Sequence, residues 1–149
     1  MTAFIDRLDT ADGLQVIAFD VGGELHGCDI LMVQEVVTRP TIHHLPDVPP
    51  HLLGVLRLRG ELLPVLDVAA TLGLALAGPP SAVLIAEIGD RCVGVAVDGI
   101  REVVIVPSGA IRPAPSTGSA RDEYVVGVAR VDGVLLNLVD LEKIVKESA

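Results

Sequence analysis

The segment from Gly54 to Val68 reads GVLRLRGELLPVLDV, and the segment from Gly127 to Leu141 reads GVARVDGVLLNLVDL. Aligned without gaps, the two segments are identical at seven of their fifteen positions, and most of the other pairs exchange one apolar residue for another. Each segment reads as a strand, a two-residue turn, a second strand and an aspartate that can cap a short helix. A unit that occurs twice predicts two similar small β-barrels. The alternative is a coincidence between two hairpins rich in valine and leucine.

The turns of the two copies differ at one informative position. The second copy has Asp132-Gly133, a pair that suits the positive φ angles of a tight hairpin. The first copy has Arg59-Gly60, and an arginine has no local advantage there. One interpretation is that Arg59 contacts a partner or a facing carboxylate. The other is that Arg59 is an ordinary solvated surface residue.

The composition favours short strands along the whole chain. Valine, which is stiff at χ1 and suits a pleated surface, occurs 23 times among 149 residues, and 15 glycines and 10 prolines separate the apolar runs. This length suits one domain, or two very small ones that share a core. We therefore predict an all-β fold with short helices. The expected strands are 14–21, 24–28, 35–38, 41–45, 54–58, 61–66, 82–88, 92–97, 100–106, 124–131 and 134–139, and the expected short helices are 30–34, 68–72 and 141–147.

The order of these elements predicts one domain over residues 14–145. Residues 75–81 are the best linker candidate, which divides the domain into subdomains at about 14–74 and 82–139. An exchange of strands between the two subdomains is left open. Residues 107–121 are expected to form a loop, and residues 1–13 an N-terminal arm.

The charge of the chain excludes several classes of partner. The net charge is −9, and the 11 lysines and arginines are scattered, so nucleic acid and anionic membrane surfaces are not expected to bind. No apolar run approaches the ~18 residues that a membrane span needs. Acidic residues near the N-terminus argue against a signal peptide. We therefore expect a cytoplasmic protein with reduced thiols.

Catalytic chemistry is not indicated either. Cys28 and Cys92 lie among apolar strand residues and are expected to be buried and inert. His43, His44 and His51 match no metal-binding spacing and are expected at the surface, although a small metal-dependent enzyme that uses them is a distant alternative. Each of the three aspartates that follow strands has a structural explanation, as a helix cap or a turn. These are Asp67, Asp98 and Asp140. We expect no catalytic residue, no cofactor and no metal.

Beyond these patterns, the chain resembles the CheW family of chemotaxis coupling proteins from about Leu14 to Val145. The most specific stretch is LP at 45–46 and PP at 49–50, followed by GVLRLRG at 54–60 and LPVLD at 63–67, which is similar to the family signature. Further matches are CDILMVQEV at 28–36, GVAVDG at 94–99 and IRPAP at 111–115. Two positions depart from the family pattern, since Arg57 stands where the family often has asparagine and His26 where it often has an aromatic residue.

The resemblance implies two intertwined SH3-like five-stranded barrels. It also implies a non-enzymatic adaptor that joins the cytoplasmic tip of chemoreceptors to the regulatory domain of the histidine kinase CheA, in arrays where other CheW-like domains are further possible partners. A non-flagellar chemosensory pathway, for surface motility or gene regulation, is the alternative setting. The implied contact residues are Val33, Glu35, Gly54 and Arg59 and, more loosely, the strands around Val83, Ile100 and Val103.

Overall fold

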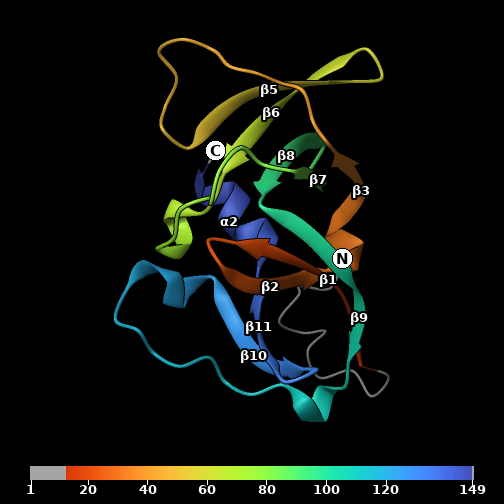
Figure 1. Cartoon of the computed structure of the whole chain (residues 1–149), viewed down its shortest axis with the longest axis vertical. Coiled ribbons are helices and arrows are strands. Elements are labelled where there is room, and N and C mark those ends of the chain that lie inside the picture. Colours follow the sequence, from red (N-terminus) through yellow and green to blue (C-terminus); the bar gives the residue numbers. More distant parts are fainter. Residues whose placement is uncertain (1–12, 149) are drawn as a thin grey trace.

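The computed structural model describes residues 13–148, in which two β-sheets lie one above the other along the longest axis (Figure 1). Sheet A has the strand order β10-β11-β2-β1-β9, and sheet B has the order β3-β7-β8-β6-β5-β4. The strands are β1 (Leu14–Val21), β2 (Glu24–Asp29), β3 (Val33–Thr38), β4 (Ile42–His43), β5 (Leu52–Leu58), β6 (Glu61–Asp67), β7 (Ala82–Ile88), β8 (Arg91–Val97), β9 (Gly99–Val106), β10 (Val125–Val131) and β11 (Val134–Val139). The predicted all-β class is confirmed, and a short strand, β4, gives sheet B six strands instead of five.

Tight turns in which residues have positive φ connect the two strands within several hairpins. Both residues have positive φ in three turns, namely Gly22-Gly23, Arg59-Gly60 and Asp132-Gly133. This geometry matches the twist of the flanking strands, which is why two-residue loops favour it. The two repeated segments accordingly form equivalent hairpins, β5–β6 and β10–β11.

The two sheets exchange strands between the halves of the chain. Sheet A combines the first hairpin, β1–β2, with β9, β10 and β11, whereas sheet B combines β7–β8 with β3 to β6. In both sheets the second strand of the repeat pairs in parallel with a strand from the other half: Val65 of β6 lies opposite Gly94, and Leu138 of β11 lies opposite Gly27. The segment 75–81 therefore separates the two repeats in sequence, but neither sheet is built from one repeat alone.

The edges of each sheet are brought together by the chain itself. In sheet B the edge strands β3 and β4 are consecutive and are separated only by residues 39–41, so the sheet must curl. In sheet A the segment that leaves β9 returns to β10, where Arg112 and Val128 exchange two backbone hydrogen bonds of 2.8 Å. Closing a sheet in this way removes edges that would otherwise pair with other chains.

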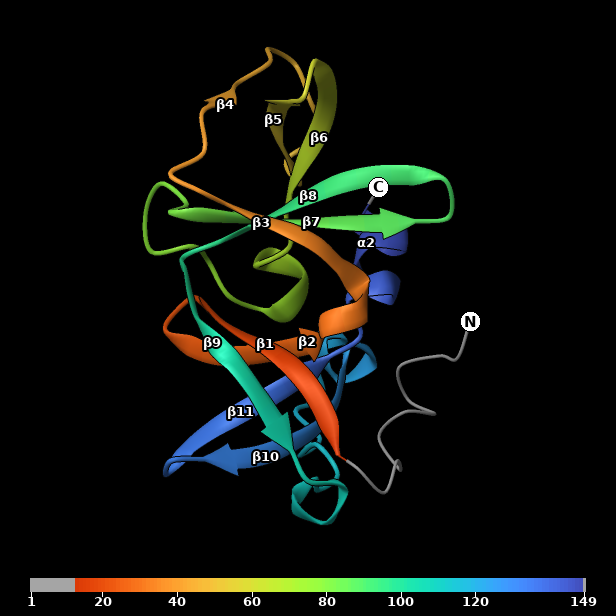
Figure 2. The ribbon, with the colours of Figure 1, turned by 90° about the vertical axis from the view of Figure 1, so that its right-hand side faces the viewer.

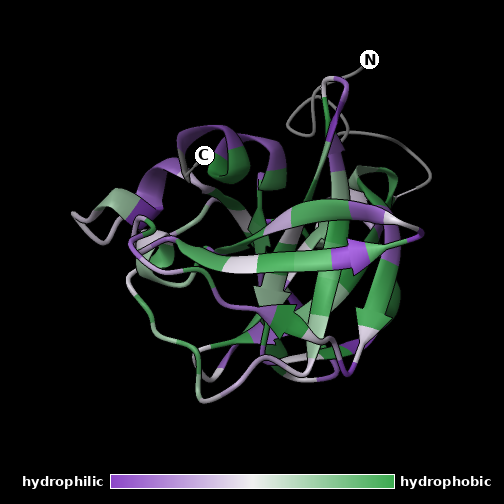
Figure 3. Ribbon diagram, turned by 90° about the horizontal axis from the view of Figure 1, so that it is seen from above, coloured by the Kyte–Doolittle hydropathy of each residue, from purple (hydrophilic) through white to green (hydrophobic). Residues whose placement is uncertain are grey.

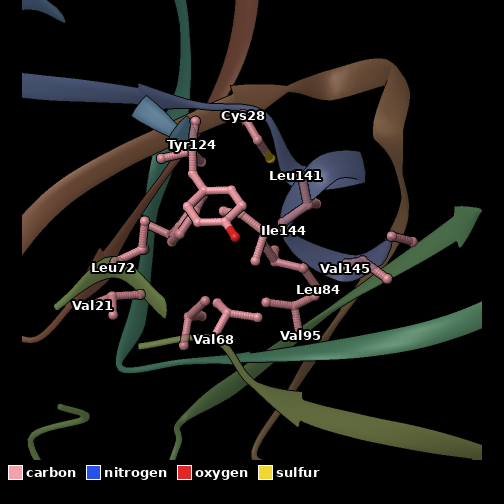
Figure 4. Packing of buried hydrophobic residues seen from close by; sticks show 14 of the residues in the cluster. Val21, Cys28, Val68, Leu72, Leu84, Val95, Tyr124, Leu141, Ile144 and Val145 are labelled. Carbon is pink, nitrogen blue, oxygen red and sulfur yellow. The ribbon is translucent and has the colours of Figure 1, made fainter. Parts of the chain in front are cut away.

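The largest apolar cluster lies between the two sheets. Figure 4 shows side chains from both sheets and from the helix α2 (Leu141–Ser148) meeting in it, including Val21, Leu84 and Ile144. Apolar residues follow the strands, and polar residues collect at the turns (Figure 3). Two smaller clusters fill the interiors of sheets A and B. The large cluster therefore packs residues of both sheets into one shared core.

Two of the short helices follow predicted aspartate caps, and most are shorter than predicted. Asp140 caps α2, because its Oδ1 accepts the Lys143 N–H at 3.1 Å. Asp29 caps the 3₁₀ turn η1 (Ile30–Met32), and strand β3 begins at Val33, so the helix expected over 30–34 is wrong at its end. Asp67 does not cap a helix as predicted: its Oδ1 accepts the Ala69 N–H at 2.9 Å, but the 3₁₀ turn η2 (Ala70–Leu72) has Ala69 as its N-cap and no side-chain cap. The expected loop over 107–121 contains η3 (Ser108–Ala110) and leads into η4 (Ala120–Glu123).

Candidate partner-binding surface

An ion pair joins two of the residues that the sequence singled out. Arg59 Nη1 lies 2.6 Å from Glu35 Oε1, which connects the β5–β6 turn to the edge strand β3. The arginine side chain is 75% exposed and the glutamate side chain 30%, so solvent screens the pair. Arg59 thus has the facing carboxylate that one of the two interpretations required. The sequence could not identify that carboxylate, because β3 and the turn are not neighbours in the sheet order.

Apolar residues precede this ion pair along the same segment. Val33 is half-buried and packs against the large core cluster, and Leu31 on η1 is 74% exposed. The segment from Leu31 to Glu35 therefore presents an exposed apolar group, a half-buried valine and a paired carboxylate within five residues. Leu31 was not expected here, because nothing in its local sequence distinguishes it from a core residue.

Strand β9 contributes a second group of exposed apolar residues. Val103 is 52% exposed and Ile105 is 64% exposed, while Ile100 is half-buried against the large core cluster. Strand β9 is an edge of sheet A and pairs with β1, and η1 contacts β1. Figure 2 shows η1, β3, β1 and β9 on the face turned to the viewer. We call the residues Leu31, Val33, Val103 and Ile105 the apolar face.

Two of the expected contact residues have structural roles that their positions explain. Val83 is fully buried in the core cluster of sheet B, so its side chain is not available to a partner in the folded chain. Gly54 is buried too, at a shift in the β5–β6 register, and a Cβ atom there would collide with the carbonyl oxygen of His43 on β4. Gly54 therefore permits the close approach of β4 to β5.

The histidines among residues 13–148 differ in their burial. His26 is fully buried, its Nδ1 lies 3.1 Å from the Glu24 carbonyl oxygen, and burial lowers its pKa. His43 and His44 are exposed, and His51 is half-buried. Within residues 13–148, no three histidine, cysteine or acidic side chains lie together in a way that would hold a metal ion.

The two cysteines differ, which corrects the expectation that both are buried. Cys28 is fully buried, and burial raises its pKa to about 12. Cys92 is half-buried, because it is only the second residue of β8 after an exposed hairpin tip. Its Sγ lies 3.5 Å from Gln34 Oε1.

Together, these features combine exposed apolar side chains with an exposed ion pair. An apolar face beside an exposed ion pair is suited to recognition of another protein. The part of the chain that the structure describes contains no helix that is long and apolar enough to cross a membrane.

Comparisons with known proteins agree with this interpretation. Residues 15–149 match the family model described as the CheW-like domain. The chain is 31% identical to the chemotaxis protein CheW of Rhizobium meliloti over 138 residues, which cover 91% of this chain and 89% of that protein. It is 32% identical to the chemotaxis protein CheW of Klebsiella aerogenes over 136 residues, which cover 89% and 81% of the two chains.

A solved structure is similar as well. The scaffolding protein TtCheW from Thermoanaerobacter tengcongensis superposes with a TM-score of 0.76 and 28% identity, and the match covers 89% of this chain and 92% of that chain. The chain therefore belongs to the CheW family, whose members are non-enzymatic adaptors.

Proposed function

We propose that this protein is the adaptor that couples chemoreceptors to a CheA-type histidine kinase. Membership in the CheW family over nearly the whole chain is the observation that carries the proposal. An adaptor of this kind needs two separate binding surfaces and a rigid body between them. The continuous core between sheets A and B supplies such a body.

The apolar face is the proposed site for the cytoplasmic tip of a chemoreceptor. The tip is a helical hairpin, and a helix binds such a surface by placing its apolar side chains against it. Leu31, Val103 and Ile105 are exposed and are available for this contact. The Glu35–Arg59 ion pair borders the segment that carries Leu31 and Val33. Its charges would contact polar groups of the partner at the rim of the interface and so contribute to specificity.

The proposed kinase contact is of another kind. The regulatory domain of the kinase is itself CheW-like in the family resemblance, so the contact would run between barrels. Other CheW-like domains are further proposed partners by the same contact. Both partners place the protein in the cytoplasm, at membrane-associated receptor arrays. Interfaces of this transient type are modest in area, and a few residues dominate the affinity.

Binding measurements with separate partners test the proposal. Purified protein is titrated with the cytoplasmic tip hairpin of a chemoreceptor and, separately, with the regulatory domain of a CheA-type kinase from the same organism. We expect the wild type to bind both. Absence of binding to either partner from that organism would contradict the adaptor role.

A pair of surface variants then tests the apolar face. The double variant Leu31→Ser, Val103→Ser removes two exposed apolar side chains, and we expect it to weaken tip binding by roughly thirtyfold, because each loses about 1 kcal/mol of burial in the complex. The control is Val134→Ser, which removes a similarly exposed valine from the β10–β11 hairpin. Equal tip affinity for the double variant and the wild type would place the receptor elsewhere.

A further inference from the structure

The chain passes from sheet B to sheet A through a single residue. Strand β8 ends at Val97 and strand β9 begins at Gly99, so Asp98 alone spans the change of sheet. The other direct passage, from β2 to β3, runs through the three-residue turn η1, and there Asp29 caps its own turn by accepting the Leu31 N–H. The side chain of Asp98, in contrast, accepts hydrogen bonds from segments other than its own.

The carboxylate of Asp98 binds two backbone segments that are remote from it in sequence. Its Oδ2 accepts the Gly22 N–H at 2.8 Å, and its Oδ1 accepts the Ala77 N–H at 2.9 Å. Gly22 belongs to the β1–β2 turn of sheet A, whereas Ala77 belongs to the segment that leads into β7 of sheet B. One side chain therefore holds a part of each sheet.

The backbone of Asp98 completes the junction. Its N–H donates to the Asp20 carbonyl oxygen at 2.9 Å, and its carbonyl oxygen accepts the Ser81 hydroxyl at 2.5 Å. The Gly22 turn also packs directly against the segment before Ala77. This contact is so close that a Cβ atom on Gly22 would approach the Leu74 Cβ to 2.8 Å. Four hydrogen bonds from one residue therefore converge where the two sheets meet.

We propose that Asp98 is a positioning residue that fixes the orientation of sheet A relative to sheet B. The apolar face depends on this orientation, since Leu31 and Val33 precede or begin β3 of sheet B while Val103 and Ile105 lie on β9 of sheet A. The affinity of a partner that contacts both groups therefore depends on the angle between the two sheets. This consequence for binding rests on the function proposed above, whereas the structural role does not.

The structural role is tested by residual dipolar couplings of the full chain. In the wild type, backbone N–H couplings from sheets A and B fit one common alignment tensor. We expect Asp98→Ala to require different tensors for the two sheets, or to reduce the alignment of one sheet. Asp98→Asn should show a smaller effect, because its single side-chain oxygen can accept from only one of the two N–H groups.

The matched control is Asp90→Ala, which removes a carboxylate of the same charge from the exposed β7–β8 turn. Circular dichroism and thermal unfolding establish that each variant is folded, and Asp98→Asn carries the measurement if Asp98→Ala does not fold. A single common tensor for a folded Asp98 variant would overturn the proposal.

The consequence for binding is tested with the two partners separately. We expect Asp98→Ala to weaken binding of the receptor tip by about fivefold, the factor that one ordinary hydrogen bond represents. Binding of the kinase regulatory domain by a barrel-to-barrel contact should stay unchanged. Equal losses for both partners would indicate general destabilisation and contradict a positioning role. If the wild type does not bind the tip, the proposed function fails, while the dipolar couplings still decide the role of Asp98.

Discussion

Arg59 Nη1 lies 2.6 Å from Glu35 Oε1, and Arg59 holds this position with a left-handed backbone, at a φ of 50°. An arginine in this conformation costs about 1 kcal/mol, whereas the equivalent Asp132 of the second hairpin tolerates it. An exposed ion pair contributes about 0–1 kcal/mol, which roughly offsets that cost. The net contribution of Arg59 to stability is therefore small, and its role in binding stays a prediction.

Replacing Arg59 tests this separation between binding and stability. We expect Arg59→Asn to change the free energy of unfolding by less than about 1 kcal/mol, because asparagine tolerates the left-handed conformation. The same variant should weaken binding of at least one partner. Glu35→Gln should weaken binding of the same partner, and the double variant should be no weaker than the single ones if the pair acts as a unit. Arg130→Asn on the other hairpin is the control. If Arg59→Asn binds both partners with wild-type affinity, Arg59 is an ordinary solvated surface residue.

Gly54 is expected to matter for a packing reason. A methyl group at this position collides with the backbone of His43, and backbone cannot move aside as a flexible side chain can. We expect Gly54→Ala to lower the free energy of unfolding by about 1–3 kcal/mol, in the range of overpacked sites. Urea denaturation measures the change. The control is Gly78→Ala, where a Cβ atom would meet nothing within 4 Å. Equal stability of the two variants would show that β4 is free to move away from β5.

Because His26 is buried, we expect the folded protein to lose stability in weak acid. Burial lowers its pKa from the ordinary 6.5, although the Glu24 carbonyl and the charges of Glu24 and Asp20 oppose this and Arg121 adds to it. The unfolded chain therefore binds a proton more readily than the folded chain, so stability is fully present above about pH 6.5 and falls as the pH drops below it. Its Nε2 has no hydrogen-bond partner in the interior, so protonation would leave a buried charge unpaired.

Stability curves between pH 7.5 and pH 5 measure this effect. We expect His26→Gln to have a flatter dependence on pH than the wild type, whatever its absolute stability. His43→Gln, which removes an exposed histidine, is the control. A wild-type slope in His26→Gln would assign the pH dependence to other groups.

The two thiols should react at very different rates. Cys28 is fully buried with a pKa of about 12, so it offers almost no thiolate, whereas Cys92 is half-buried near a hairpin tip. Titration of the native protein with a thiol reagent at pH 8 should modify Cys92 rapidly and Cys28 only after unfolding. Cys92→Ser should abolish the rapid phase and Cys28→Ser should retain it. A rapid phase that survives in Cys92→Ser would show that Cys28 becomes exposed in the native state.

Much of the local structure was predictable from the sequence. The strands over 14–21, 82–88 and 134–139 have the predicted bounds, and the repeated segments form the two hairpins that their turns indicated. The predicted caps at Asp29 and Asp140 accept backbone N–H groups two and three residues away, whereas Asp67 accepts the Ala69 N–H without capping the turn that follows. Each of these features depends on residues within one turn or one strand, and that is the range over which sequence patterns carry information.

The candidate surface was only partly predictable, because exposure depends on what covers each strand. Val83 and Val103 are both valines in strands, yet β7 lies inside sheet B and β9 lies at the edge of sheet A, so the first is buried and the second is half exposed. Cys92 is less buried than its apolar neighbours predicted, because it lies near the exposed tip of the β7–β8 hairpin. Leu31 and Ile105 were missed, since nothing in their local sequence distinguishes them from core residues.

The sequence by itself determined the turns, the strands, two of the aspartate caps and the repetition of the hairpin, because these follow from backbone preferences and from the spacing of apolar residues. Only the tertiary structure decided which strands share a sheet, and hence that each sheet takes strands from both repeats. The meeting of Glu35 with Arg59, and of Asp98 with Gly22 and Ala77, was decided in the same way. Such contacts join residues 21 to 76 positions apart. Those of Asp98 form because burial of the shared core brings the two sheets together, whereas Glu35 meets Arg59 because sheet B curls.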